Sequence, residues 1–298
     1  MVIGEWRVLG FDSAKNAFYS SLGVAPLVSS VCGLNLCSAD FKSNARVKVY
    51  RDCRLLQVCN DNIFVDGKIE AIDRKSVRRY EVPPRGQAAD PERSLEESQR
   101  RAVSAVRDIT RCNRFEYMFT WTLNDKLINR YNPDEVYKRV SYFLRNASRR
   151  KGFRYVVIPE YHKLRHGEDS PGIHFHGLCN LGSVQIKRAL YKDGSFRVDK
   201  SGRSVFNMVD WKFGWSTCVP IDENYNRACS YIVKYITKSK NKIFGKWYLS
   251  SRDLQKRPDI LFIEPVDFYQ FRDTQKIASG FQYETRVFKD ITIVSEEF

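Results

Sequence analysis

Hydrophobic and polar positions follow two different periods along the chain, and these periods predict the order of strands and helices. From residue 114 onward, three runs are β-branched and aromatic, as is typical of strands: RFEYMFTWTL, FRYVVIPEYH and IHFHGLCNL. Between the first two runs, apolar residues recur every three or four positions through 132–150, which predicts a helix. Asn132 and Pro133 supply a capping side chain and a ring that suits the first helical position.

Two further helices and a hairpin complete the pattern. An apolar stripe that includes Leu95 and Val106 predicts a helix after residue 92, and another helix is expected around 223–240. Two glycine turns predict a hairpin at 191–203, followed by one strand over 204–221. The resulting order predicts an α+β fold with a central, mostly antiparallel sheet of about five strands and flanking helices.

The rest of the chain has a less regular pattern. Residues 1–82 contain short strand-like runs, and 82–92 are rich in proline, glycine and alanine, which is typical of a linker. We therefore expect an N-terminal extension over 1–90, a principal domain over 91–270 and a C-terminal tail over 271–298.

Composition narrows the class of protein. Of the 298 residues 43% are hydrophobic, yet no apolar run approaches the ~20 residues that cross a bilayer. The first residues lack a basic region followed by an apolar core, so we expect a cytoplasmic protein without a membrane partner. We expect the eight cysteines to be free thiols. The pairs Cys32/Cys37 and Cys53/Cys59 are the alternative, although their spacing fits poorly.

Charge points to a polyanionic partner. Fifty Lys and Arg residues against 35 Asp and Glu give a net charge of +15. The excess is concentrated in 136–159 and 227–257, where aromatic residues lie between the cations. Cations beside stacking rings favour a single-strand DNA groove, and a solvated basic surface with ordinary core aromatics is the alternative. The predicted DNA-binding residues are Arg145, Arg149, Arg150, Lys151, Arg154, Lys240, Lys242 and Lys246.

All four histidines lie within residues 162–176. Because alternate side chains of a strand share a face, His174 and His176 point one way, and Glu160 and His162 share a face of the preceding strand. An antiparallel register with Glu160 opposite His176 and His162 opposite His174 gathers these side chains. The set predicts a Mg²⁺ or Mn²⁺ site, and two half-buried histidines without a ligand role are the alternative. We expect His166 to be solvent-exposed.

The segment YIVKYITK, residues 231–238, provides candidate nucleophiles. At 100° per residue, one stripe holds Tyr231, Lys234, Tyr235 and Lys238. The apolar residues lie on the opposing side, so we expect both tyrosines to lie off the apolar face. A phenol of pKa ~10 is a weak nucleophile at neutral pH. A divalent ion that polarises the scissile phosphate, and a lysine that stabilises the developing charge, would compensate for this. An amphipathic helix with snorkelling lysines is the alternative.

Together these motifs resemble the HUH endonuclease superfamily, and specifically the rolling-circle replication initiators of phages and plasmids. The HFH pair resembles the superfamily's paired histidines, and FTWTL at 119–123 resembles its first motif. Glu160 stands where many initiators have a third metal ligand. YIVKYITK resembles the double-tyrosine helix of initiators from isometric single-stranded DNA phages. The resemblance spans about 114–257 and leaves the first 90 residues unassigned.

The resemblance implies an HUH (palm-like) sheet and a metal-dependent nickase. A tyrosine would attack single-stranded or hairpin origin DNA, form a 5′-phosphotyrosine and release a 3′-hydroxyl. Tyr231 and Tyr235 would alternate in strand transfer, with Tyr231 ranked first, and Lys234 and Lys238 would stabilise the phosphate. The sequence has no G-x-x-x-x-G-K-[ST], so the expected partners include a host helicase as well as DNA polymerase. A relaxase, a transposase and a non-catalytic DNA-binding regulator remain alternatives.

Overall fold

The structure is a computed structural model, and it divides the chain into two compact units that are each described by themselves. One unit is Pro83–Arg257, and the other combines Met1–Val82 with Pro258–Phe298. The structure describes residues 36–37, 43–51, 53–60, 62–65, 68–71, 87–162, 164, 170–239, 241–263, 265, 267–270, 283–287 and 291–297.

A seven-stranded antiparallel sheet forms the centre of unit 83–257. In spatial order its strands are β12 (Leu249–Ser250), β7 (Arg154–Tyr161), β8 (Ile173–Asn180), β6 (Tyr117–Leu123), β11 (Gly214–Pro220), β10 (Phe206–Met208) and β9 (Ile186–Arg188). With its helices this sheet confirms the predicted α+β fold, although the described sheet has seven strands where about five were expected.

Each of the three α-helices that the structure describes in this unit begins after a residue whose side chain caps it. Helix α3 (Pro91–Cys112) is capped by Asp90, whose carboxylate accepts the Arg93 amide hydrogen at 3.0 Å. Asn132 caps α4 (Pro133–Lys151), as predicted. Gly152 ends α4 at a φ of +66°, a conformation that suits glycine. Asn224 caps α5 (Tyr225–Lys238).

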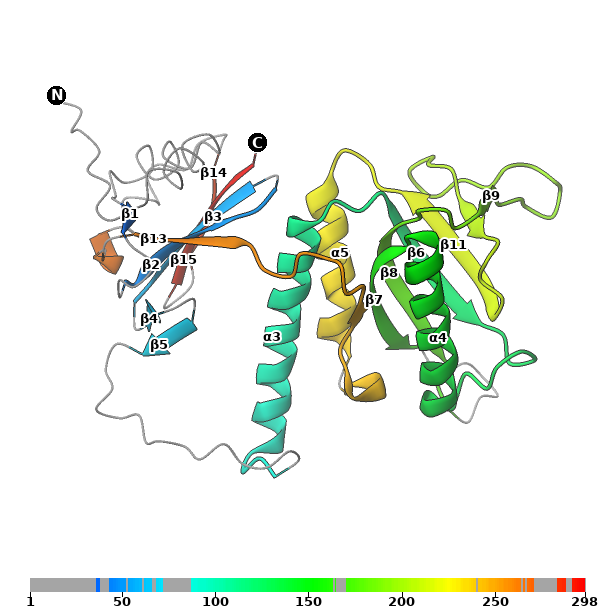
Figure 1. Ribbon diagram of the computed structural model, residues 1–298, viewed down its shortest axis with the longest axis horizontal. Helices are drawn as coiled ribbons and strands as arrows, with labels where there is room; N and C mark the ends of the chain where they lie inside the picture. The colour runs from blue at the N-terminus through cyan, green and yellow to red at the C-terminus, as the bar shows by residue number, and fades with distance from the viewer. Residues whose placement is uncertain are drawn as a thin grey trace. The chain divides into compact units, whose positions relative to one another are not determined.

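The two faces of the sheet differ in character because β6 alternates. Phe119, Trp121 and Leu123 point toward α4, where Trp121 stacks on Trp211 with ring centroids 4.2 Å apart. The intervening threonines of β6 point to the other face. On that face α3 and α5 lie side by side and pack on β7 and β8 (Figure 1). The large aromatic core therefore occupies one face and leaves part of the other open for polar chemistry.

The predicted single strand over 204–221 is wrong. A tight turn between Met208 and Gly214 separates β10 from β11, and the two strands pair through Phe206 and Cys218. The sequence pattern of 204–221 does not indicate this turn, because Trp211 within the turn is buried against the aromatic core and continues the apolar run. The glycine turns at 191–203 form as predicted, with isolated bridges Leu190–Phe196 and Val198–Ser204.

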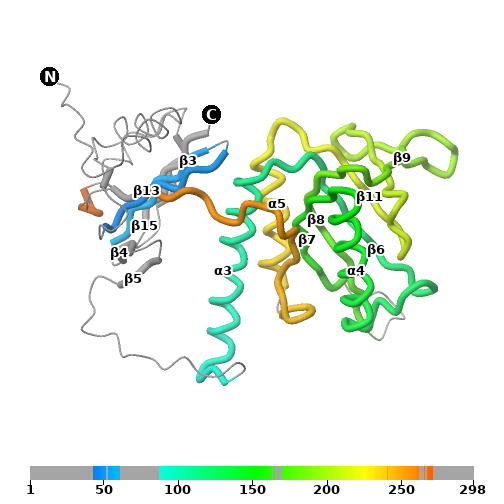
Figure 2. Tube along the Cα trace, in the orientation of Figure 1, coloured from blue at the N-terminus to red at the C-terminus, as the bar shows by residue number. Residues whose placement is uncertain are grey.

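The second unit contains a six-stranded antiparallel sheet and the separate pair β4 (Asn62–Val65) and β5 (Lys68–Ala71). The order of the six is β1 (Leu36–Cys37), β13 (Asp259–Ile263), β2 (Ala45–Val49), β3 (Cys53–Cys59), β15 (Ile291–Glu297) and β14 (Tyr283–Val287). In Figure 2 the orange β13 lies beside the blue β2 and β3.

These pairings differ from the domain boundaries expected from sequence. Strand β13 pairs with β2 and not with the sheet of 83–257, although it falls inside the expected domain 91–270. Strand β15, from the expected tail, pairs with β3. Such pairing between distant segments leaves no local pattern in the sequence.

Two smaller expectations concern the thiols and the membrane. Cys53 and Cys59, one of the two pairs considered as an exception, are both buried and are not joined by a disulfide, whereas Cys32 of the other pair lies outside the described residues. None of the helices in the described part of the chain combines the length and apolar character of a membrane span.

Gly177 generates a first prediction because it lets β6 and β8 approach closely. A Cβ at this position would overlap the Phe119 ring and lie 2.8 Å from the Val156 carbonyl oxygen. We expect Gly177→Ala to lower the free energy of unfolding by about 1–3 kcal/mol, as overpacking does, measured by urea denaturation.

The control for this prediction is Phe119→Leu, which removes the ring. The double variant should lose less stability than the sum of the two single losses, because the smaller side chain makes room for the added methyl group. Strict additivity would show that the contact between Gly177 and Phe119 does not limit stability.

Candidate active site

Strands β7 and β8 bring three possible metal ligands together on the face that α5 covers. The register pairs Glu160 with His174 and Ile158 with His176. The predicted register, with Glu160 opposite His176 and His162 opposite His174, is therefore wrong by two residues. Because side chains alternate with period two, a shift of two keeps every side chain on the predicted face. The three side chains therefore still converge, although the register differs from the predicted one.

The three side chains meet at one carboxylate oxygen. Nε2 of His174 lies 3.0 Å from Glu160 Oε2, and Nε2 of His176 lies 3.1 Å from the same oxygen. Within the described residues, Glu160, His174 and His176 form the one group of three or more His, Cys, Asp or Glu residues that could hold a metal ion.

Electrostatics keep this cluster in the protonation states that suit a metal. Burial raises the pKa of Glu160, but hydrogen bonds from His174 and His176 outweigh it and lower the pKa to about 2. Burial lowers the pKa of His176, against the opposing effect of its hydrogen bond to Glu160. The cluster at neutral pH therefore offers an ionised carboxylate and a neutral imidazole, the forms that bind divalent cations.

Thr120 orients His176 from the neighbouring strand. Its Oγ1 lies 3.1 Å from His176 Nδ1, which directs Nε2 toward Glu160. The hydroxyl can accept a hydrogen bond from a protonated Nδ1, so it suits the tautomer of a ligand that binds through Nε2. This supporting role follows from the β6–β8 register, in which Thr120 faces His176.

The donor set fits a hard divalent cation. Mg²⁺ binds at about 2.1 Å with octahedral geometry, so adjacent ligand atoms are about 3.0 Å apart. The two Nε2–Oε2 separations in the cluster, 3.0 and 3.1 Å, are close to that edge length. These three residues could therefore hold a divalent metal ion.

His162 and His166 do not have the same standing as the two clustered histidines. His162 contributes a ring whose centroid is 5.0 Å from that of His174, at a steep angle, but it is not one of the three clustered ligands. His166, which we expected to be solvent-exposed, lies outside the described residues.

Helix α5 places both candidate tyrosines beside the cluster. The Tyr235 ring stacks on the His176 ring with centroids 3.6 Å apart and planes 8° apart. Its hydroxyl donates a hydrogen bond of 2.5 Å to the Tyr231 oxygen. The two phenols and the imidazole therefore form one continuous contact that leads from the metal ligands to the surface.

The expectation that both tyrosines lie off the apolar face is wrong for Tyr235. Tyr235 is 6% exposed, whereas Tyr231 is 43% exposed. Tyr235 is part of the core that α3 and α5 build on this face, because α5 packs against both the sheet and α3. Burial and the bond to Tyr231 raise the pKa of Tyr235, so its phenol stays protonated.

The two lysines of the stripe are both exposed. Nζ of Lys238 lies 5.5 Å from the centroid of the Tyr235 ring, and its charge contributes to the lowered pKa of His176. Lys234 lies one turn before Lys238 on the same helix.

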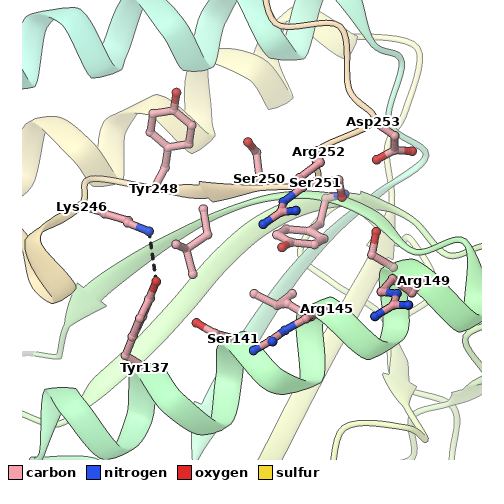
Figure 3. Close-up of a pocket in the computed structure, with 14 residues that line it drawn as sticks. Tyr137, Ser141, Arg145, Arg149, Lys246, Tyr248, Ser250, Ser251, Arg252 and Asp253 are labelled. Carbon is pink, nitrogen blue, oxygen red and sulfur yellow. Dashed lines mark hydrogen bonds between the residues drawn. The ribbon is translucent and has the colours of Figure 1, made fainter.

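A cavity of about 980 Å³ gathers several predicted DNA-binding residues at the edge of the sheet near β12 (Figure 3). Arg145 and Arg149 line it from α4, and Lys246 and Arg252 line it from the segment around β12. Leu249, also in the lining, pairs with Val157, a residue of the α4-side core. The cavity therefore opens on the α4 face, away from the metal ligands.

The charge of this cavity is largely uncompensated. Its one acidic lining residue, Asp253, already pairs with Arg154 at 3.1 Å. Lys246 donates a 3.0 Å hydrogen bond to the Tyr137 hydroxyl, and this bond lowers the pKa of Tyr137. Arg252 was not among the predicted DNA-binding residues, although it lies in the basic segment 227–257.

Of the other predicted DNA-binding residues, Arg150, Lys151 and Lys242 lie outside the lining of this cavity. Arg150 and Lys151 line a smaller hollow of about 280 Å³ on α4, where Lys151 pairs with Asp210 at 2.7 Å. Lys242 lies 6.0 Å from the centroid of the Trp247 ring. Lys240 lies outside the described residues.

Comparison with known proteins relates part of the chain to a family of replication-associated proteins. The chain matches no curated protein and no solved structure at a significant level. Residues 116–240 match the family model for the replication-associated protein ORF2, and that segment contains the three clustered ligands and both tyrosines. The match supports a replication-associated function with DNA as partner, and a relationship to rolling-circle replication initiators.

Proposed function

We propose that this protein is a rolling-circle replication initiator of the HUH type that nicks single-stranded DNA and transfers the strand through a tyrosine. The observation that carries the proposal is the stacking of Tyr235 on His176 of the cluster, together with the hydrogen bond from Tyr235 to Tyr231. A phosphodiester held at this cluster would lie next to a phenol, as an in-line attack requires. The family match supports the same function.

Tyr231 is the first nucleophile in this proposal because it is exposed and accepts a hydrogen bond. Tyr235 keeps its proton and donates a hydrogen bond to the Tyr231 oxygen. A donor held in this position stabilises negative charge on that oxygen as the tyrosine loses its proton. The buried Tyr235 would act after the first transfer, as the second nucleophile.

The proposed reaction exchanges one ester bond for another. The Tyr231 oxygen bonds to phosphorus, and the bond between phosphorus and the 3′ oxygen breaks. The phenol proton passes to solvent and the departing 3′ oxygen takes up a proton. The products are a 5′-phosphotyrosine and a 3′-hydroxyl that a host polymerase could extend while a host helicase opens the duplex.

Metal and lysine contribute charge in this scheme. Glu160, His174 and His176 would hold Mg²⁺ or Mn²⁺, which when bound polarises a phosphate oxygen as a Lewis acid. Lys234 and Lys238 would lie on the phosphate side, because both are exposed on the helix that carries the tyrosines.

DNA outside the nick would be held by the cations of the α4-side cavity. Arg145, Arg149, Lys246 and Arg252 offer charges that acidic side chains of the lining do not neutralise. Such cations bind phosphates without reading sequence, and they release counterions when they do so.

Metal binding provides the first test of this function. Replacing Glu160 with glutamine removes the negative charge of the carboxylate on whose oxygen both Nε2 atoms converge. We expect Glu160→Gln to weaken Mn²⁺ binding at least about tenfold, measured by calorimetry or Mn²⁺ spectroscopy without DNA. Glu223→Gln, the same change at an exposed glutamate, should bind Mn²⁺ like the unaltered protein. Equal affinity in both variants would remove Glu160 from the metal site.

The nucleophile is tested with random single-stranded oligonucleotides labelled at the 3′ end, because the fragment joined to tyrosine carries that end. With Mn²⁺ we expect a covalent protein–DNA band on a denaturing gel, which chelator abolishes. Tyr231→Phe should remove most of the band. Tyr235→Phe should weaken the band without removing it, because it loses only the supporting hydrogen bond, and the double variant should show none.

The other outcomes of this experiment identify the alternatives. DNA binding without any covalent band would favour the non-catalytic regulator. A band that persists in Tyr231→Phe but disappears in Tyr235→Phe would reverse the proposed order of the tyrosines. Sequencing the attached DNA end would give the nick site and separate initiator from relaxase or transposase substrates.

The cavity is tested by the salt dependence of DNA binding with chelator present. Arg145→Gln combined with Arg252→Gln removes two cations that line it. For single-stranded DNA we expect the slope of log K against log[salt] to fall by about 1.4 in magnitude, at about 0.7 per lost phosphate contact.

The matched control for the cavity changes two exposed lysines outside its lining, Lys126→Gln and Lys138→Gln. Its slope should stay near that of the unaltered protein. If both double variants reduce the slope equally, binding depends on overall charge and not on the cavity.

A further inference from the structure

The register of the sheet extends the row of metal ligands across two more strands. Glu160 pairs with His174, His174 pairs with Thr122, and Thr122 pairs with Trp215. Directly paired residues of neighbouring antiparallel strands carry their side chains on the same face. Trp215 of β11 therefore lies on the metal-binding face, in the same row as Glu160 and His174.

The next row has the same polar character. His176 pairs with Thr120, which pairs with Thr217. Thr120, Thr122 and Thr217 are all partly exposed, whereas Phe119 and Trp121 on the other face are buried. Helix α5 packs on β7 and β8, at the other end of these rows. The face over β6 and β11 is thus an open floor of threonines beside the metal ligands.

Trp215 is exposed in a way that packing does not require. It is 63% exposed, while the other tryptophans that the structure describes, Trp121, Trp211 and Trp247, are each 7% exposed or less. Beyond it, Lys187 of β9 pairs with Asn207, the neighbour of Phe206 in β10. Because Phe206 pairs with Cys218 of the α4-side core, Asn207 and the exposed Lys187 belong to the metal face.

We propose that Trp215 is a stacking platform for a base of the DNA strand that is nicked, with the threonine floor beneath the strand and Lys187 near its backbone. This inference rests on the proposed function. Two strand spacings of about 4.8 Å separate Trp215 from His174 across the sheet. At the ~3.4 Å rise of a stacked strand, the base lies within about three nucleotides of the phosphate at the metal ligands.

The ligand class follows from the chemistry of the surface. An indole stacks on any base, so this position accepts single-stranded DNA with little sequence preference. A base within a duplex would not offer its face to the ring, which makes unpaired DNA the substrate. The site therefore restricts the nickase to a melted or extruded segment.

The test compares Trp215→Ala and Trp215→Phe with the unaltered protein, using a short oligothymidylate and chelator. We expect tryptophan fluorescence to be quenched on binding in the unaltered protein and much less in both variants. Trp215→Ala should bind about tenfold more weakly, whereas Trp215→Phe should retain most of the affinity because it can still stack.

The matched control is Tyr142→Ala, which removes an aromatic ring that is 62% exposed on α4. It should bind oligothymidylate like the unaltered protein. The proposal is overturned if Trp215→Ala binds normally, or if Tyr142→Ala loses the same affinity. Circular dichroism of each variant checks that the fold is retained.

A second arm uses the DNA sequence recovered from the covalent band. An abasic nucleotide within three positions of the nick should reduce adduct formation by the unaltered protein and have little further effect on Trp215→Ala. Loss of the covalent band in all proteins would reject the nickase, while normal abasic sensitivity in Trp215→Ala would reject the stacking role alone.

Discussion

The site depends on the register between β7 and β8. That register brings Glu160 beneath both histidines, so that two Nε2 atoms approach one carboxylate oxygen. A slip of one residue would turn Glu160 to the opposite face and replace it with a neighbour that has no metal-binding group. The core on the α4 face opposes such a slip, because Tyr155 and Val157 of β7 are buried there together with Phe175 of β8. Packing on one face thus determines the chemistry on the other.

The alternation of side chains was enough to predict which residues share the metal face, because parity is a local property. The register was not, since a shift of two residues leaves every face unchanged and differs only in which backbone groups pair. The sequence between the two strands, KLRHGEDSPG, is polar and does not specify a turn of one length. The same reasoning explains the missed turn between β10 and β11, where the buried Trp211 continues the apolar pattern through a reversal of the chain.

The remaining predictions failed where they depended on contacts between elements that are distant in the sequence. A helical stripe shows which residues lie together, but not how many neighbours cover it, and α5 packs against both α3 and the sheet. Tyr235 is buried for that reason, although the stripe placed it with the exposed Lys234. Likewise the basic segments predicted cations near DNA, whereas only the folded chain unites Arg145 with Arg252 in one cavity and pairs Lys151 with Asp210.

The two tyrosines are unequal, and this inequality constrains any mechanism that alternates between them. Tyr235 contributes to the core and stacks on His176, so its movement would disturb both the packing of α5 and the orientation of the His176 ring. Tyr231 could move with less effect on the fold, because its side chain is exposed and its hydroxyl accepts a hydrogen bond from Tyr235. In the proposed reaction, the oxygen of Tyr231 would be esterified after the first transfer and could no longer hold a negative charge for Tyr235 to stabilise. The bond between the two hydroxyls must then weaken, which would free the Tyr235 hydroxyl at the stage when a second nucleophile is needed.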